Sequence, residues 1–122
     1  MYEVAVEASF TAAHRVRDAS GEFEPPHMHH WHVRATFAGA ELNEAGLLVD
    51  FTEAQRCLRQ AVALLDGSDL NACPALAGVA PSAEGVAKGI YDLLVKHAAL
   101  RPLLRRVTVT EAPGCCASYI AS

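Results

Sequence analysis

Hydrophobic and polar residues alternate along two stretches near the amino terminus, residues 2–14 and residues 27–39. Alternation with a period of two is typical of a strand that buries one face. The apolar positions of the two stretches are Tyr2, Val4, Val6, Ala8, Phe10, Ala12 and His14, then His27, His29, Trp31, Val33, Ala35 and Phe37. The polar, proline-containing residues 15–26 between them predict a loop. The pattern therefore predicts an antiparallel hairpin.

Two later stretches have helical spacing. Asp50, with Glu53 three positions on, is typical of a helix start, and apolar residues then recur every three or four positions. A second helix is predicted to begin near residues 81–82, to carry His97 on its apolar face, and to end at Pro102.

Two short strands are predicted near the carboxyl terminus, at residues 107–111 and 118–120, with Pro113-Gly114 between them. No internal repeat or linker interrupts the chain, so residues 1–122 are expected to form a single domain. The order β-β-α-α-β-β predicts an α+β fold, with a four-stranded antiparallel sheet and two helices on one face.

Composition narrows the classes of function. The chain has 122 residues, is 52% hydrophobic, and carries 10 Lys and Arg against 14 Asp and Glu, a net charge of −4. This excludes a disordered chain and argues against a nucleic-acid partner. No apolar run approaches the roughly 20 residues that cross a bilayer, and the amino terminus lacks a signal-peptide pattern. Four cysteines without a C-x-x-C pair indicate reduced thiols, so we expect a soluble cytoplasmic protein with no membrane partner.

The placement of the histidines is the most informative chemical feature. His27 and His29 are two apart in a predicted strand, so both project from its apolar face, and His14 ends the apolar face of the preceding strand. Three imidazoles that converge, with a fourth position open, are typical of a catalytic zinc. The alternative is that these are core or rim histidines hydrogen-bonded to neighbours. His30 and His32 lie on the polar parity, where we expect solvent.

Six short motifs of the chain occur in the same order as the corresponding motifs of one known family. The chain resembles the 6-pyruvoyl-tetrahydropterin synthase and 6-carboxytetrahydropterin synthase family, nearly from end to end. In order, the motifs are Phe10-Thr11-Ala12-Ala13-His14-Arg15, His27-Met28-His29-His30-Trp31, Gly46-Leu47-Leu48-Val49-Asp50-Phe51, Leu65-Asp66-Gly67-Ser68-Asp69-Leu70-Asn71, Pro81-Ser82-Ala83-Glu84 and Glu111. The resemblance implies a T-fold whose trimers form barrels and stack into a homohexamer, and a pterin as ligand. It also implies zinc on His14, His27 and His29, although Met28 stands where the family has glycine.

The resemblance also implies which residues bind the substrate. Glu111 shares its strand face with Val107 and Val109, and a carboxylate there can accept two N–H bonds from a pterin ring. The alternative is an exposed strand-end glutamate. Ser82 and Glu84 belong to a substrate-binding motif, but a negative charge in the first turn of a helix is also favourable without a ligand.

The catalytic residues are where the chain departs from the family. Phe23 stands where the family has its proton-shuttling cysteine, and Gly67 replaces the histidine of an Asp-His pair of which only Asp66 remains. Glu24 occupies the position at which a variant branch of the family carries a catalytic glutamate, although acids in loops are often merely solvated. We therefore expect either a zinc-dependent lyase that acts on 7,8-dihydroneopterin triphosphate, or an inactive pterin-binding protein. A purely structural oligomer is a third hypothesis.

Overall fold

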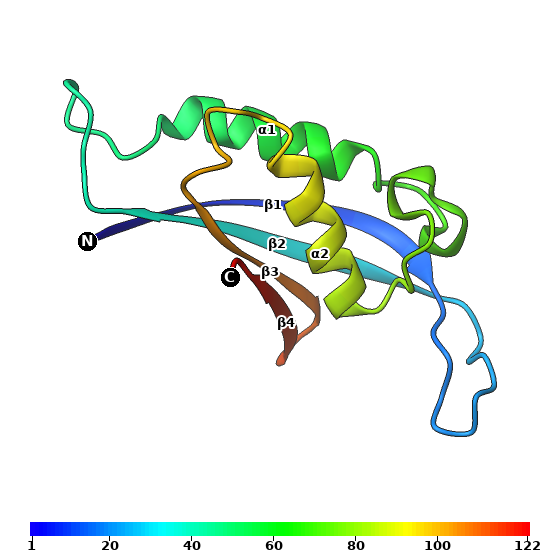
Figure 1. Cartoon of the computed structure of the whole chain (residues 1–122). Helices are drawn as coiled ribbons and strands as arrows, with labels where there is room; N and C mark the ends of the chain where they lie inside the picture. Colours follow the sequence, from blue (N-terminus) through cyan, green and yellow to red (C-terminus); the bar gives the residue numbers. More distant parts are fainter.

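The computed structural model describes all 122 residues. Its four strands form one antiparallel sheet in the order β1-β2-β3-β4. The elements are β1 (Tyr2–His14), β2 (His27–Gly39), α1 (Phe51–Ala63), α2 (Ala83–Leu94), β3 (Leu104–Ala112) and β4 (Cys115–Ile120), with two short 3₁₀ turns, Leu70–Ala72 and Pro74–Leu76, before α2. Both helices lie on the same face of the sheet (Figure 1). The predicted α+β fold and its order of elements are confirmed.

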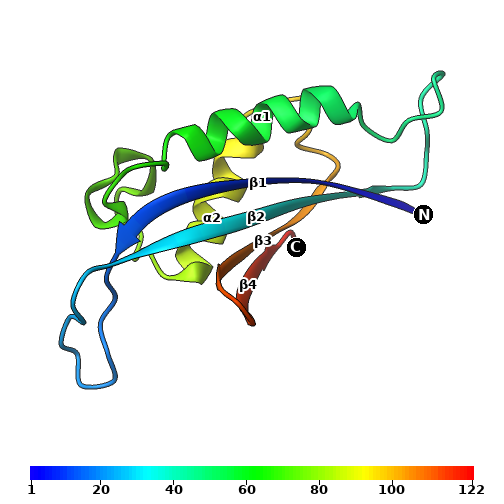
Figure 2. The same cartoon turned by 180° about the vertical axis from the view of Figure 1, so that it is seen from behind.

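The strands β1 and β2 form a long hairpin without a register shift. Tyr2 pairs with Gly39 at one end, and His14 pairs with His27 at the other. The loop of residues 15–26 connects the two strands and extends beyond the end of the sheet (Figure 2). The hairpin therefore places the histidine-bearing strand ends beside this loop.

Apart from Thr36, the buried residues of β1 and β2 occupy the parity that alternation predicts, on the face that the helices cover. Phe10 and Trp31 stack there with their ring centroids 5.8 Å apart, and Trp31 Nε1 donates a hydrogen bond to the Ala12 carbonyl. The other face carries polar side chains that solvent reaches, and on it His30 is exposed and His32 is half-buried. Within one chain, no element covers this second face (Figures 1 and 2).

The start of α2 is tightly packed against the residues that precede it. The Ser82 hydroxyl accepts a hydrogen bond from the Gly85 amide and so caps the helix. A Cβ at Gly85 would lie 1.9 Å from the Ala80 carbonyl oxygen, so only glycine fits there. This close approach holds residues 80–82 against the first turn of the helix.

The predicted end of the second helix is wrong. α2 ends at Leu94 rather than Pro102, and His97 lies outside it in a series of turns over residues 95–103. The regular helix ends here because the amides of Lys96 and His97 bond to carbonyls three residues back, and the His97 carbonyl then accepts bonds from the Leu100 and Arg101 amides. The strands β3 and β4 also begin earlier than predicted, at residues 104 and 115. No helix of the chain is long and apolar enough to span a membrane.

Candidate metal centre

The structure brings together the three histidines that share the apolar parity. His14 and His27 are direct cross-strand partners, and His29 lies two residues along the same face of β2, opposite the small Ala12. One ring nitrogen from each of the three lies within 4.8 Å of the others. The ring centroids are 4.8 Å apart for His14 and His27, 5.1 Å for His14 and His29, and 4.4 Å for His27 and His29.

Hydrogen bonds donated to backbone carbonyls orient two of these rings. His14 Nδ1 lies 2.7 Å from the Pro81 carbonyl oxygen, and His27 Nδ1 lies 3.1 Å from the Pro25 carbonyl oxygen. Because a carbonyl only accepts, Nδ1 carries the proton in each ring, and the lone pair of the neutral imidazole is on Nε2. Outer-shell bonds of this kind typically fix the tautomer of a metal-binding histidine.

Two of the Nε2 atoms are buried without a hydrogen-bond partner, those of His14 and His29. Such atoms are rare in folded proteins and need an explanation. Burial lowers the pKa of His29, so its ring stays neutral and keeps a lone pair for a ligand. Three imidazoles whose ring nitrogens converge, two of them buried and unpartnered, fit zinc, which takes three protein ligands in catalytic sites.

Glu111 reaches the same cluster from the end of β3, as its parity predicted. Its Oε1 lies 2.8 Å from His14 Nε2, although the geometry of this contact is not that of a hydrogen bond. Since the Nδ1 proton of His14 is donated to Pro81, a neutral ring turns an electron pair toward this carboxylate. Two electron pairs at this distance require a cation, either a proton on the ring or a metal ion.

Glu24 also lies beside the cluster. Its Oε1 accepts a hydrogen bond from the Val16 amide at 3.3 Å and lies 3.7 Å from His27 Nε2. Glu24 is half-buried, whereas Glu22, two residues earlier in the same loop, is exposed. Glu24, which stands near the position of the family's cysteine, thus lies next to the histidine cluster.

Asp66 is not brought to the histidines within one chain. Its Oδ1 accepts a hydrogen bond from the Thr11 amide at 3.0 Å, and the next residue, Gly67, donates to the Thr11 carbonyl. Asp66 instead lines a separate cavity of about 340 Å³ together with Glu7 and Arg59. Its carboxylate therefore lies at the free edge of β1.

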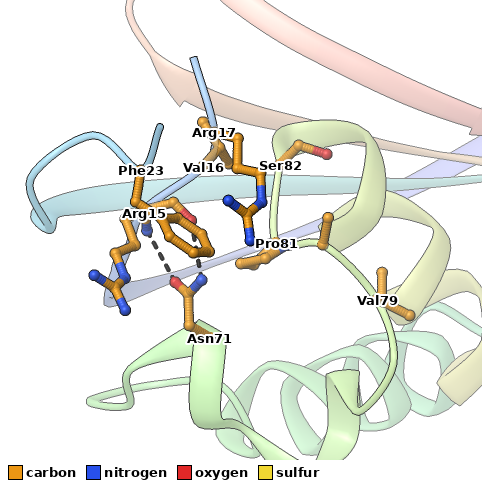
Figure 3. A pocket seen from close by; sticks show the side chains of 9 residues that line it. Arg15, Val16, Arg17, Phe23, Asn71, Val79, Pro81 and Ser82 are labelled. Carbon is orange, nitrogen blue, oxygen red and sulfur yellow. Dashed lines mark hydrogen bonds between the residues drawn. The ribbon is translucent and has the colours of Figure 1, made fainter. Parts of the chain in front are cut away.

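Two cavities lie on either side of His14. The larger, of about 410 Å³, is lined by Arg15, Val16, Arg17, Phe23, Asn71, Val79, Ala80, Pro81 and Ser82 (Figure 3). The smaller, of about 300 Å³, is lined by Ala83, Glu84, Glu111, Cys115, Cys116 and Ala117. His14 lies between the two cavities, because its Nδ1 bonds to Pro81 of the larger one and its Nε2 contacts Glu111 of the smaller one.

Reasoning from sequence placed Ser82 and Glu84 in one motif, and the structure places them in different cavities. The sequence did not identify Arg17 as a residue of the larger cavity, because the path of a loop does not follow from periodicity. Arg15 was already visible as the last residue of the first motif. Cys115 and Cys116 also line a cavity that sequence reasoning did not predict.

An antiparallel sheet with two helices on one face, and three histidines that converge on that face, identifies the chain as a T-fold protein. Comparisons with known proteins identify its family. The model of the 6-pyruvoyl tetrahydropterin synthase family matches residues 3–122, so the chain belongs to this family. No curated protein sequence matches the chain significantly.

Solved structures of several relatives have the same fold. The Caenorhabditis elegans 6-pyruvoyl tetrahydropterin synthase matches with a TM-score of 0.82 and 19% identity, over 100% of this chain and 98% of that one. A Plasmodium vivax 6-pyruvoyltetrahydropterin synthase with a catalytic glutamate mutated to alanine matches with a TM-score of 0.76 and 19% identity, over 97% and 96%. An uncharacterized protein from Wolinella succinogenes matches with a TM-score of 0.75 and 17% identity, over 99% and 98%.

Proposed function

We propose that this chain is a zinc-dependent lyase that binds 7,8-dihydroneopterin triphosphate and cleaves its side chain to leave 6-hydroxymethyl-dihydropterin. The observation that carries the proposal is the convergence of three imidazole nitrogens beside the carboxylates of Glu24 and Glu111. His14, His27 and His29 would hold the zinc. When bound, it supplies a Lewis acid for the oxygens of the substrate side chain.

Glu111 is the proposed anchor of the pterin ring. The ring has two adjacent N–H donors, and a carboxylate can accept both. Glu111 and Glu84 line the same cavity, which is therefore acidic and suits a ligand that is rich in donors. Ser82, at the start of α2, is proposed to contact the substrate from the larger cavity.

Glu24 is the proposed general base. It takes the proton from the second side-chain hydroxyl, the bond between the first two side-chain carbons breaks, and the electron pair moves into the ring. The proton then returns to the first carbon, so the products are the hydroxymethyl pterin and a two-carbon aldehyde that carries the phosphates. Support comes from the position of Glu24 near His27 and from the catalytic glutamate of the Plasmodium vivax relative.

A second candidate function is a pterin-binding protein without catalysis. Phe23 favours it, because this side chain stands in place of the family's cysteine and contacts the side chains of Arg15 and Arg17. Gly67 favours it too, because it lacks the imidazole of the family's Asp-His pair. In either case we propose that the chain does not make 6-pyruvoyl-tetrahydropterin or 6-carboxytetrahydropterin efficiently.

The proposed assembly is a homohexamer of two stacked trimers. Two observations support it, the unpaired edges of β1 and β4 and the polar sheet face that nothing in the chain covers. Pairing of these edges between subunits would close a barrel and remove exposed edges. Asp66, at the β1 edge, would then lie near a neighbouring subunit, where we propose its catalytic role. All four cysteines are free thiols, which supports the proposed cytoplasmic location.

Incubation with 7,8-dihydroneopterin triphosphate, with mass detection of all three products, tests the proposal. We expect 6-hydroxymethyl-dihydropterin, and a loss of about 100-fold or more in Glu24→Gln. Glu22→Gln is the matched control, because this residue is exposed and bonds to its loop neighbours only through its own backbone amide and carbonyl. Efficient formation of either tetrahydropterin would contradict the proposal. Tight pterin binding without any product would favour the second candidate function.

A further inference from the structure

The larger cavity beside the metal centre contains two arginines that contact one aromatic ring. The guanidinium carbons of Arg15 and Arg17 lie 4.4 Å and 4.2 Å from the centroid of the Phe23 ring (Figure 3). Each contact is a cation–π interaction, in which the face of the ring attracts the positive charge of the guanidinium. The ring thus holds both guanidinium groups beside one another in the lining of the cavity.

The charges of these two arginines are not neutralised within the chain. Neither arginine forms an ion pair. The one hydrogen bond that either guanidinium makes runs from Arg17 Nη1 to the Gly21 carbonyl, at 2.8 Å. Both charges lie near one ring, so they are less than about 9 Å apart, roughly a Debye length at physiological salt. Two like charges are therefore held close together in a chain of net charge −4.

None of the three acidic residues of the same loop, Asp18, Glu22 and Glu24, forms an ion pair with either arginine. Asp18 accepts hydrogen bonds from Ser20 and from the Glu22 amide, and Glu24 faces the metal centre. Asn71 bonds to the backbone amide and carbonyl of Arg15, so it fixes this residue but leaves its guanidinium free. Glu22 is exposed and forms no ion pair, so no carboxylate of the loop neutralises either guanidinium by direct contact.

The start of α2 adds to the positive potential of these two arginines. Ser82 lines the cavity and caps this 12-residue helix, whose first amides have no acceptor within the helix. The amino end of a helix attracts anions. On the other side of His14, the smaller cavity carries Glu84 and Glu111, which repel them.

We propose that Arg15 and Arg17, stacked on Phe23, bind the oligophosphate tail of the ligand. A guanidinium that stacks by its face keeps its N–H edge for phosphate oxygens. The proposal deepens the proposed function, on which it rests, because it gives the ligand a direction, with the phosphates in the basic cavity and the ring in the acidic one. Phe23, in place of a proton-shuttling cysteine, becomes a positioning residue for the two cations.

Calorimetric titration of the zinc-loaded protein with three ligands tests this assignment. The ligands are neopterin triphosphate, neopterin, and inorganic tripolyphosphate, with the metal content measured after each titration. We expect Arg15→Gln and Arg17→Gln each to weaken binding of neopterin triphosphate by about 10-fold or more, and to change binding of neopterin less than about 2-fold. Phe23→Leu keeps both charges but removes the ring, and should weaken triphosphate binding by about 2- to 5-fold.

Arg105→Gln is the matched control, since it removes the same charge from an exposed position on β3 where the guanidinium bonds only to the Ala121 carbonyl. We expect it to change triphosphate binding less than about 2-fold, so a loss equal to that of Arg17→Gln would overturn the assignment. Unchanged triphosphate affinity in the Arg15→Gln, Arg17→Gln double variant would also overturn it, while leaving the proposed function intact. Equal losses for neopterin and its triphosphate would place the arginines at the ring and refute the proposal.

Titration with tripolyphosphate tests phosphate binding in the basic cavity independently of pterin binding. If tripolyphosphate binds the wild type and the double variant loses this binding, the phosphate assignment stands even when neopterin does not bind. That result would count against the proposed function alone. Tripolyphosphate binding that persists in the double variant would count against the basic cavity as the phosphate site.

Discussion

Replacement of His29 by alanine should remove the metal without unfolding the chain. The His29 Nε2 atom is buried and has no hydrogen-bond partner, so the substitution breaks no hydrogen bond from this nitrogen. Burial of an unsatisfied polar group costs about 1–3 kcal/mol, and its removal offsets the lost packing of the ring. We therefore expect the free energy of unfolding of the metal-free protein to change by less than about 1 kcal/mol.

The effect on the zinc-loaded protein should be much larger. A ligand that binds only the folded state stabilises it by about 2.7 kcal/mol when its free concentration is 100 times its Kd. For a domain of this size, about 4 °C in Tm per kcal/mol makes this a rise of roughly 10 °C. Loss of an outer-shell partner already costs 10- to 100-fold in metal affinity. Loss of a ligand should cost at least about 100-fold, which leaves a stabilisation of about 0.4 kcal/mol at the same zinc concentration.

Thermal melts with and without zinc, at one fixed protein concentration, measure this difference, and elemental analysis after dialysis gives the zinc per chain. We expect about one zinc per wild-type chain and none in His29→Ala. His30→Ala is the control, because its imidazole lies on the opposite sheet face, beside the Thr11 hydroxyl. If His29→Ala kept one zinc per chain, or His30→Ala lost as much zinc, the ligand assignment would be refuted.

Three further predictions test the pterin-ring anchor, the assembly, and the corner before α2, which is formed by residues 80–82. Glu111→Ala should weaken neopterin binding by about 2–4 kcal/mol in a calorimetric titration, whereas the exposed Glu41→Ala should not. Light scattering should give the mass of six chains, and a monomer mass at micromolar concentration would contradict the proposed hexamer. Gly85→Ala should lower the free energy of unfolding by at least about 2 kcal/mol in urea melts, because its Cβ meets the Ala80 carbonyl. Gly89→Ala should cost less, because its Cβ meets only a leucine methyl that can turn away, and equal losses would refute this reasoning.

The corner before α2 also shows why some features could not be predicted from the sequence. The Pro81 carbonyl accepts the proton of His14, a residue 67 positions earlier, and the Glu111 carboxylate contacts the same ring from a third strand. Periodicity describes the direction of a side chain relative to its own element, so it predicted that Glu111 points toward the covered face. It could not predict which atom the carboxylate meets, because that depends on the packing of three elements.

The sequence alone determined the order of the elements and the face on which each histidine lies. Side-chain direction in a strand is a local property of the backbone, so alternation was sufficient to group His14, His27 and His29 and to separate them from His30. The tertiary structure decided what lies around them. It placed Arg17 beside Phe23 and kept Asp66 away from the cluster, because loop paths and long-range contacts depend on the packing of the whole chain.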